Sequence, residues 1–168
     1  MKKNLLVVLS ILTLLFTSSV YAQKALPSPR EVAKGKVAGA TVIIDYGSPS
    51  VKGRQIWGGL VPNGEVWRTG ANEATVFTTN KEIMVEGKKL AAGSYAFFAI
   101  PNEGSWTIIF NKTAKQWGAF KYNSKEDALR VTVKTKHSPA FHERLLYVVN
   151  SNGFSLEWEN LEVPVMIK

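Results

Sequence analysis

Apolar and polar residues alternate in short runs along most of the chain after residue 40. The clearest run spans residues 129–136, where Leu129, Val131 and Val133 alternate with charged or hydroxylated residues. A period of two places alternate side chains on opposite faces of a strand, so this run predicts a strand with one buried and one wet face. Beyond residue 22 no stretch keeps a 3.6-residue period for three turns, so the pattern predicts strands rather than helices.

Other strands are expected where similar apolar runs lie between turn residues, at 40–46, 75–79, 83–85, 88–90, 95–100, 106–110, 145–149, 154–159 and 161–167. Glu86-Gly87 predicts a two-residue hairpin, and Asn152-Gly153 predicts a type I′ turn. His137-Ser138-Pro139 predicts a break, and Pro164 makes the last strand an edge strand. A series of short strands of this kind, with turn residues between them, predicts a single all-β domain, an antiparallel β-sandwich or jelly roll.

The first 22 residues have the features of a secretory signal peptide. Lys2 and Lys3 precede an apolar run at 5–16, and small residues precede Gln23. The apolar run is shorter than the ~20 residues that cross a bilayer, so no membrane span is expected after cleavage. We therefore expect an exported protein, in the periplasm or outside the cell, with an extended segment at 23–35 and the sandwich at 36–168.

The composition excludes several kinds of functional site. The chain has no Cys, which excludes disulfides and Cys-based metal sites. Its formal charge is +8, but the lysines are scattered, which favours a solvated surface facing an anionic envelope over a nucleic-acid partner. His137 and His142 have no third ligand at a suitable spacing, so we expect no metal and no cofactor. No motif of nucleophilic catalysis or phosphate binding is present, which favours a non-catalytic protein.

Candidate site residues gather in one glycine-rich stretch, residues 53–79. It contains Arg54, Trp67, Arg68, Asn72 and Glu73. As a binding site, Trp67 would supply an apolar platform, and either arginine would hold an anionic or hydroxyl-rich ligand in its planar fork. Asn72 and Glu73 would fix the ligand's orientation. The architectural alternative is that Arg68 pairs with Glu73 and the cluster satisfies buried backbone groups of a long connection.

The same stretch carries a family resemblance. The segments 52–54 (KGR), 60–62 (LVP) and 67–75 (WRTGANEAT) resemble the signature of the DUF2911 family. Asn111-Lys112, Trp117-Gly118, Tyr122 and Arg130 resemble it as well. The resemblance implies an exported bacterial protein of a kind common among Bacteroidetes, and it implies no activity, because none is established for the family. Lys112 is a further candidate ligand contact or a surface charge, and Trp117 is expected to cover one end of the sandwich.

Three functional hypotheses follow from these residues. The first is a non-catalytic module that binds a glycan or another small polar ligand. The second is a hydrolase in which Glu73 works with a second carboxylate such as Asp45. Carboxylate pairs of this kind need ~5–9.5 Å between their carboxyl groups. The third is a scaffold that uses the sheet edge near Pro164. The sequence gives no indication of the oligomeric state.

Overall fold

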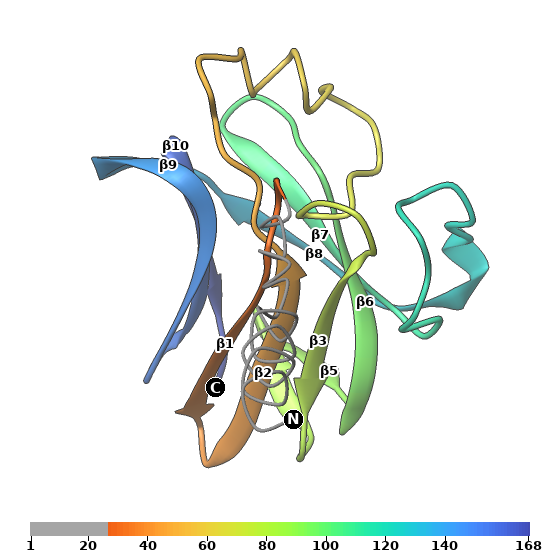
Figure 1. Cartoon of the computed structure of the whole chain (residues 1–168). Coiled ribbons are helices and arrows are strands. Elements are labelled where there is room, and N and C mark those ends of the chain that lie inside the picture. Colours follow the sequence, from red (N-terminus) through yellow and green to blue (C-terminus); the bar gives the residue numbers. More distant parts are fainter. Residues whose placement is uncertain (1–26) are drawn as a thin grey trace, which may run out of the picture.

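A computed structural model describes residues 27–168 of the protein, and the predicted signal peptide lies outside the described residues. Its main layer is an antiparallel six-stranded sheet with the order β1-β2-β3-β6-β7-β8. The strands are β1 (Arg30–Val37), β2 (Ala40–Gly47), β3 (Thr75–Thr79), β6 (Gly93–Ile100), β7 (Ser105–Asn111) and β8 (Asp127–Lys134). The all-β antiparallel fold is as predicted (Figure 1).

A second layer packs against this sheet. It consists of the long hairpin of β9 (Lys136–Asn150) and β10 (Gly153–Met166), joined by the short hairpin of β4 (Ile83–Val85) and β5 (Lys88–Leu90). Met84 and Lys168 exchange backbone hydrogen bonds of 2.9 Å, which tie β4 to the chain end that follows β10. The two layers form a sandwich, with β9 and β10 facing the larger sheet in Figure 1.

The space between the layers is filled mainly by aromatic rings. Phe77, Phe97 and Phe110 come from the six-stranded sheet, and Phe154 and Trp158 come from β10; all five are buried. Phe77 and Phe97 each lie with their ring centroids 5.5 Å from that of Phe154. Large buried rings contribute most of the apolar area that stabilises such a core.

The alternating run in β8 folds as its pattern predicts. Leu129, Val131 and Val133 are buried, while the residues between them are exposed. The hairpin at Glu86-Gly87 is also confirmed, with φ of 47° and 78° at its two turn residues. Both angles are positive, as a type I′ turn requires.

Two boundaries differ from the prediction. Strand β1 begins at Arg30 and pairs with β2 along its whole length, so the sheet starts before residue 36. The sequence pattern of β1 does not indicate a strand, because β1 lies at the sheet edge with most of its side chains in solvent. The predicted break at 137–139 is wrong: β9 runs through Pro139, and the strand register shifts opposite this segment. Proline is tolerated there because an irregular ladder needs no N–H from it.

The turn between β9 and β10 also differs. Ser151 and Asn152 form it, and Gly153 is already the first residue of β10, with φ of 147°. A Cβ at Gly153 would lie 2.0 Å from the Val165 carbonyl oxygen, so close approach of the backbone selects glycine here. Within residues 27–168, no helix is long and apolar enough to cross a membrane.

Candidate functional site

The connection between β2 and β3, residues 48–74, closes over one end of the sandwich (top of Figure 1). A cavity of about 290 Å³ lies beneath it. Four of the six sequence-predicted site residues line this cavity, namely Arg54, Trp67, Arg68 and Asn72. The remaining lining residues are Ser28, Pro49, Leu60, Val61, Gly70, Ala71 and Trp158.

Backbone and hydroxyl hydrogen bonds fix the segment that carries Trp67 and Arg68. Trp67 and Ala99 exchange backbone hydrogen bonds of 2.8 and 2.9 Å, which add one antiparallel bridge to β6. The Thr69 hydroxyl donates to the Phe97 carbonyl at 2.8 Å, and the buried Tyr147 hydroxyl donates to the Thr69 carbonyl at 2.9 Å. The segment is therefore held from both layers of the sandwich.

Two glycines let this segment approach β2 closely. Ala71 donates its N–H to the Gly47 carbonyl at 3.1 Å. A Cβ on Gly47 would lie 2.2 Å from the Ala71 carbonyl oxygen, and one on Gly70 would lie 2.9 Å from the Gly47 oxygen. A side chain at either position would therefore push the cavity wall away from the sheet.

The apolar floor of the cavity is a tryptophan cluster. Trp67 and Trp158 stack with an interplanar angle of 13° and a centroid separation of 6.1 Å. Trp57 meets both of them edge to face. Trp67 is only 8% exposed, so it contributes an edge of the floor rather than the open platform expected from the sequence.

The two arginines of the cavity differ in how they are held. The guanidinium of Arg54 donates to two backbone carbonyls, from Nε to Val51 at 3.1 Å and from Nη2 to Ser50. The Nε of Arg68 is buried and has no hydrogen-bond partner among residues 27–168. Within the same residues, neither arginine forms an ion pair.

Burial lowers the pKa of the Arg68 guanidinium from its ordinary value. The group nevertheless stays charged at neutral pH, because an arginine pKa starts above 12. The cavity lining contains two guanidinium groups and no carboxylate. Its electrostatic potential is therefore positive, and a partly desolvated charge lacks a counter-charge among the described residues.

Glu73 lies on the other side of the segment, and the predicted Arg68–Glu73 pair is wrong. The Glu73 carboxylate instead contacts Arg30 Nη1 at 3.4 Å, while Arg30 Nε contacts Asp45 at 2.6 Å. The separation has a backbone cause: Asn72 has φ of 64°, and this left-handed residue reverses the chain between Arg68 and Glu73.

Glu73 lines a second cavity of about 360 Å³, together with Arg30, Asp45, Ala74, Val76, Lys115 and Gln116. Asp45 and Glu73 therefore contact the same guanidinium, that of Arg30. Both are committed to Arg30, however, so the pair offers no carboxylate that is unengaged for acid–base work.

Two other sequence candidates lie elsewhere. Lys112 is exposed and lines neither cavity. Trp117 is 60% exposed, so the expectation that it covers the sandwich end is wrong. Two neighbours of the candidate site, Arg30 and Trp158, are not predicted from the sequence. Arg30 falls in the segment expected to precede the domain, and Trp158 reaches the cavity only through the packing of the two layers.

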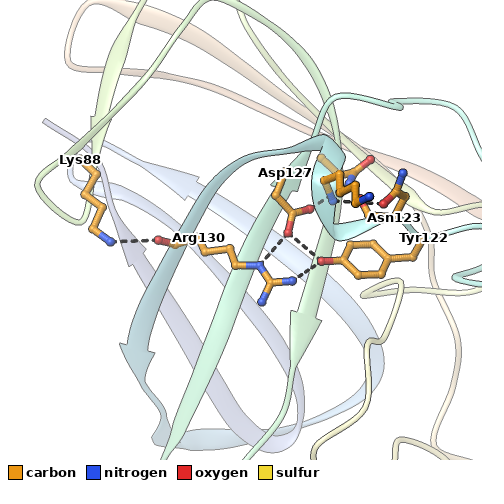
Figure 2. A network of polar contacts seen from close by, with 7 residues as sticks. Lys88, Tyr122, Asn123, Asp127 and Arg130 are labelled. Atoms are coloured by element: carbon orange, nitrogen blue, oxygen red, sulfur yellow. Dashed lines mark hydrogen bonds and ion pairs between the residues drawn. The ribbon is translucent and has the colours of Figure 1, made fainter.

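A polar network on the outer face of the sheet accounts for three of the family-like residues. Figure 2 shows Asp127 accepting hydrogen bonds from the Tyr122 hydroxyl at 2.7 Å and from Arg130 Nε at 2.6 Å. Asn111 Nδ2 donates to the other carboxylate oxygen of Asp127 at 2.9 Å. These partners fasten the β7–β8 connection to the sheet, which is a structural role.

The constellation of Ser138, His142 and Glu157 resembles a catalytic triad only in composition. Ser138 Oγ and Glu157 Oε2 both lie 3.1 Å from the same ring nitrogen, His142 Nε2. A triad needs the hydroxyl and the carboxylate on opposite ring nitrogens, so that the imidazole can pass a proton between them. In residues 27–168, no group of three or more His, Asp or Glu side chains is placed to hold a metal ion.

Comparison with known proteins gives a family and nothing closer. No curated protein and no solved structure matches the chain. A family model described as a protein of unknown function, DUF2911, matches residues 28–167. That range includes both layers of the sandwich, both cavities and the Asp127 network, and the chain therefore belongs to the DUF2911 family.

Proposed function

We propose that the protein is a non-catalytic binding module for a small polar ligand that carries an anionic group, held in the cavity between Arg54, Arg68 and Asn72. One observation carries the proposal. Within residues 27–168 the partly buried guanidinium of Arg68 forms no ion pair, and its buried Nε has no hydrogen-bond partner. It shares its cavity with a second guanidinium, that of Arg54.

Burying a charge without a partner costs free energy, because the lost hydration is not replaced. An anion between the two arginines would supply the missing interaction and form charge-assisted hydrogen bonds with the fork of Arg68. Arg54 is already oriented by the Ser50 and Val51 carbonyls. Those neutral acceptors fix its position but leave its charge available to a ligand.

The size and lining of the cavity indicate the class of ligand. A volume of about 290 Å³ lies near the lower end of ligand pockets, which run from ~300 to ~1,000 Å³, so it suits a compound about the size of one sugar ring. Trp67 and Trp158 supply an apolar wall, and the Asn72 amide can both donate and accept hydrogen bonds. An acidic monosaccharide, with a carboxylate and several hydroxyl groups, combines these features.

Binding is favoured over catalysis by what the lining lacks. The residues around the cavity include no carboxylate, histidine or lysine that could move a proton. The carboxylates nearest in sequence, Asp45 and Glu73, face the second cavity and are held by Arg30.

Isothermal titration calorimetry with D-glucuronate, D-glucose, acetate, sulfate and phosphate tests the proposal. We expect an anion to bind and glucose to bind more weakly or not at all. Arg68→Gln should reduce the anion's affinity by about tenfold or more, as loss of a desolvated charge contact does. Lys134→Gln is the control, because it removes the same charge from an exposed residue on β8 that lies outside the cavity lining.

Two results would count against the proposal. One is the absence of heat for every anion with the wild-type protein. The other is an equal loss of affinity in Arg68→Gln and Lys134→Gln, which would indicate general electrostatic attraction rather than a site.

We also place this binding outside the cytoplasm, on the basis of the signal-peptide features of residues 1–22. Expression of the full chain followed by mass spectrometry of the mature N-terminus tests this part. A new terminus at Gln23 would support export, and an intact Met1 in the cytoplasmic fraction would contradict it.

A further inference from the structure

The connection between β7 and β8 carries an exposed apolar tip, Trp117-Gly118-Ala119-Phe120. Trp117 is 60% exposed and Phe120 is 85% exposed. In Figure 1 this connection projects from the side of the six-stranded sheet, away from the β9–β10 layer. Single exposed apolar residues are ordinary on protein surfaces, but two large rings at the tip of one projecting loop mark an interaction surface.

The loop that carries this tip is firmly anchored. The Tyr122 ring packs against Phe98 with centroids 5.2 Å apart, and its hydroxyl belongs to the Asp127 network of Figure 2. On the other side, Gly118 donates its N–H to the Asn72 carbonyl at 3.1 Å, and Ala74 donates to the Gln116 carbonyl at 2.9 Å. The fold therefore holds the two rings outward while it turns Ala119 and Tyr122 inward.

Lysines flank the tip along the chain. Four of them are exposed in the same connection, and within residues 27–168 none forms an ion pair; they are Lys112, Lys115, Lys121 and Lys125. The acidic residues of this stretch are Glu126 and Asp127, and Asp127 is already paired with Arg130. The loop therefore carries positive charge on both sides of its apolar tip along the chain, although Lys115 also lines the cavity that contains Asp45 and Glu73. The chain as a whole has a formal charge of +8.

We propose that this loop docks the protein on an anionic phospholipid surface. Trp117 and Phe120 would enter the boundary between headgroups and acyl chains, where aromatic rings are favoured. The lysines would contact lipid phosphates, each adding to an attraction that weakens with salt. This inference is independent of the anion-binding cavity, because neither Trp117, Phe120 nor Lys112 lines that cavity.

The backbone of the tip suits an apolar environment. The Gly118 N–H is bonded to Asn72, and the Ala119 carbonyl accepts from the Tyr122 N–H at 3.1 Å. Polar backbone groups without partners are costly among lipid chains, and these two groups are satisfied inside the protein. The residues between the two rings are Gly118 and Ala119, so no polar side chain there can hydrogen-bond a nucleic-acid base or a sugar.

Co-sedimentation with vesicles tests the proposal. We expect the mature protein to bind vesicles of mixed phosphatidylglycerol and phosphatidylcholine, and to bind pure phosphatidylcholine much less. The double variant Trp117→Ser/Phe120→Ser should lose about tenfold or more in partitioning, since each ring contributes buried apolar area. Phe141→Ser is the control, because Phe141 is a similarly exposed aromatic residue, 55% exposed, on β9.

Charge and depth are tested separately. Lys112→Gln/Lys121→Gln should weaken binding and its salt dependence, whereas Lys34→Gln/Lys36→Gln, which removes equal charge from β1, should do so far less.

Brominated acyl chains should quench part of the tryptophan fluorescence of the wild type. Trp117→Phe should keep the binding and lose that quenching, because it retains a ring and removes the inserted indole.

Three results would overturn the inference. They are failure of the wild type to bind anionic vesicles, equal binding by the wild type and Trp117→Ser/Phe120→Ser, and tip-dependent binding to a single-stranded oligonucleotide without binding to vesicles. Circular dichroism of each variant confirms that the sandwich is intact.

Discussion

Two polar clusters, one around Asp127 and one around Arg68, are built in opposite ways. Around Asp127, each of the two carboxylate oxygens accepts a hydrogen bond: the donors are Arg130 on the same strand, Asn111 on β7 and Tyr122 in the connection between them. Around Arg68, a partly buried guanidinium faces a cavity and has no acceptor within residues 27–168. The first cluster is complete within the fold, whereas the second leaves a charged group without a partner among the described residues.

This difference separates architecture from binding more clearly than residue type does. Both clusters contain arginine, both contain an amide side chain, and both include residues that resemble the family signature. A satisfied network stabilises the element it holds, and its groups have little left to offer a ligand. An unmatched buried charge lowers the stability of the free protein and leaves its hydrogen-bonding groups available.

The largest effect is expected in the satisfied cluster. Asp127→Ala should lower the free energy of unfolding by about 2–4 kcal/mol, because it removes a nearly buried acceptor and leaves several donors without partners. Because Arg130 is partly exposed, solvent screens its ion pair with Asp127, and the loss should lie in the lower part of that range. Guanidinium chloride unfolding measures it, and a loss below that of an ordinary surface substitution would show that the network contributes little.

A smaller effect is expected from the bond that holds the cavity segment. Tyr147→Phe removes one buried hydrogen bond to Thr69 and should cost about 1 kcal/mol at neutral pH. Burial also raises the pKa of the Tyr147 phenol above its ordinary value of 10.0. The unfolded chain releases this proton near pH 10 while the folded chain keeps it, so stability that is complete below pH 10 is lost as the pH rises further.

Alkaline unfolding curves therefore distinguish the variant from the wild type. Above pH 10 a single such group lowers stability by up to about 1.4 kcal/mol per pH unit. Tyr147→Phe should show a shallower decline than the wild type, although other tyrosines with raised pKa values, Tyr46, Tyr95 and Tyr122, still contribute. Parallel curves for the two proteins would contradict this assignment.

The smallest effect is expected at the exposed pair on the other side of the segment. Glu73 is 53% exposed and contacts Arg30 at 3.4 Å, so Glu73→Gln should change stability by less than about 1 kcal/mol. The change should shrink further in high salt. It should also leave anion binding at the Arg68 cavity unchanged. A loss of several kcal/mol, or a loss of binding, would mean that the two cavities work as one.

The sequence predicts the sandwich well where one face of a strand is buried and the other is wet. Leu129, Val131 and Val133 show this, because the alternation of β8 records its burial directly. Strand β1 escapes detection because most of its side chains are exposed and its place depends on pairing with β2. The passage of β9 through Pro139 depends on a register shift in β10, which no local pattern contains.

The site is predictable as a list of residues but not as an arrangement. Arg54, Arg68 and Asn72 stand out because their residue types cluster in a glycine-rich stretch, and the structure brings them to one cavity. The Arg68–Glu73 pair fails because the left-handed conformation of Asn72 turns the chain between them. Trp117 does not cover the sandwich end as predicted, because its anchored loop holds the ring largely in solvent, and no local pattern distinguishes this tryptophan from those that pack in the core.

The most direct test of the contrast is the unfolding free energy of Arg68→Met, measured with and without an anion that binds the wild type. Methionine keeps much of the side-chain volume and removes the unmatched charge. The account predicts that the variant is as stable as the wild type or more stable without the anion, and that only the wild type gains stability when the anion is added. A variant that is clearly less stable, together with a wild type that gains nothing from any anion, would show that Arg68 belongs to the architecture and would contradict the account.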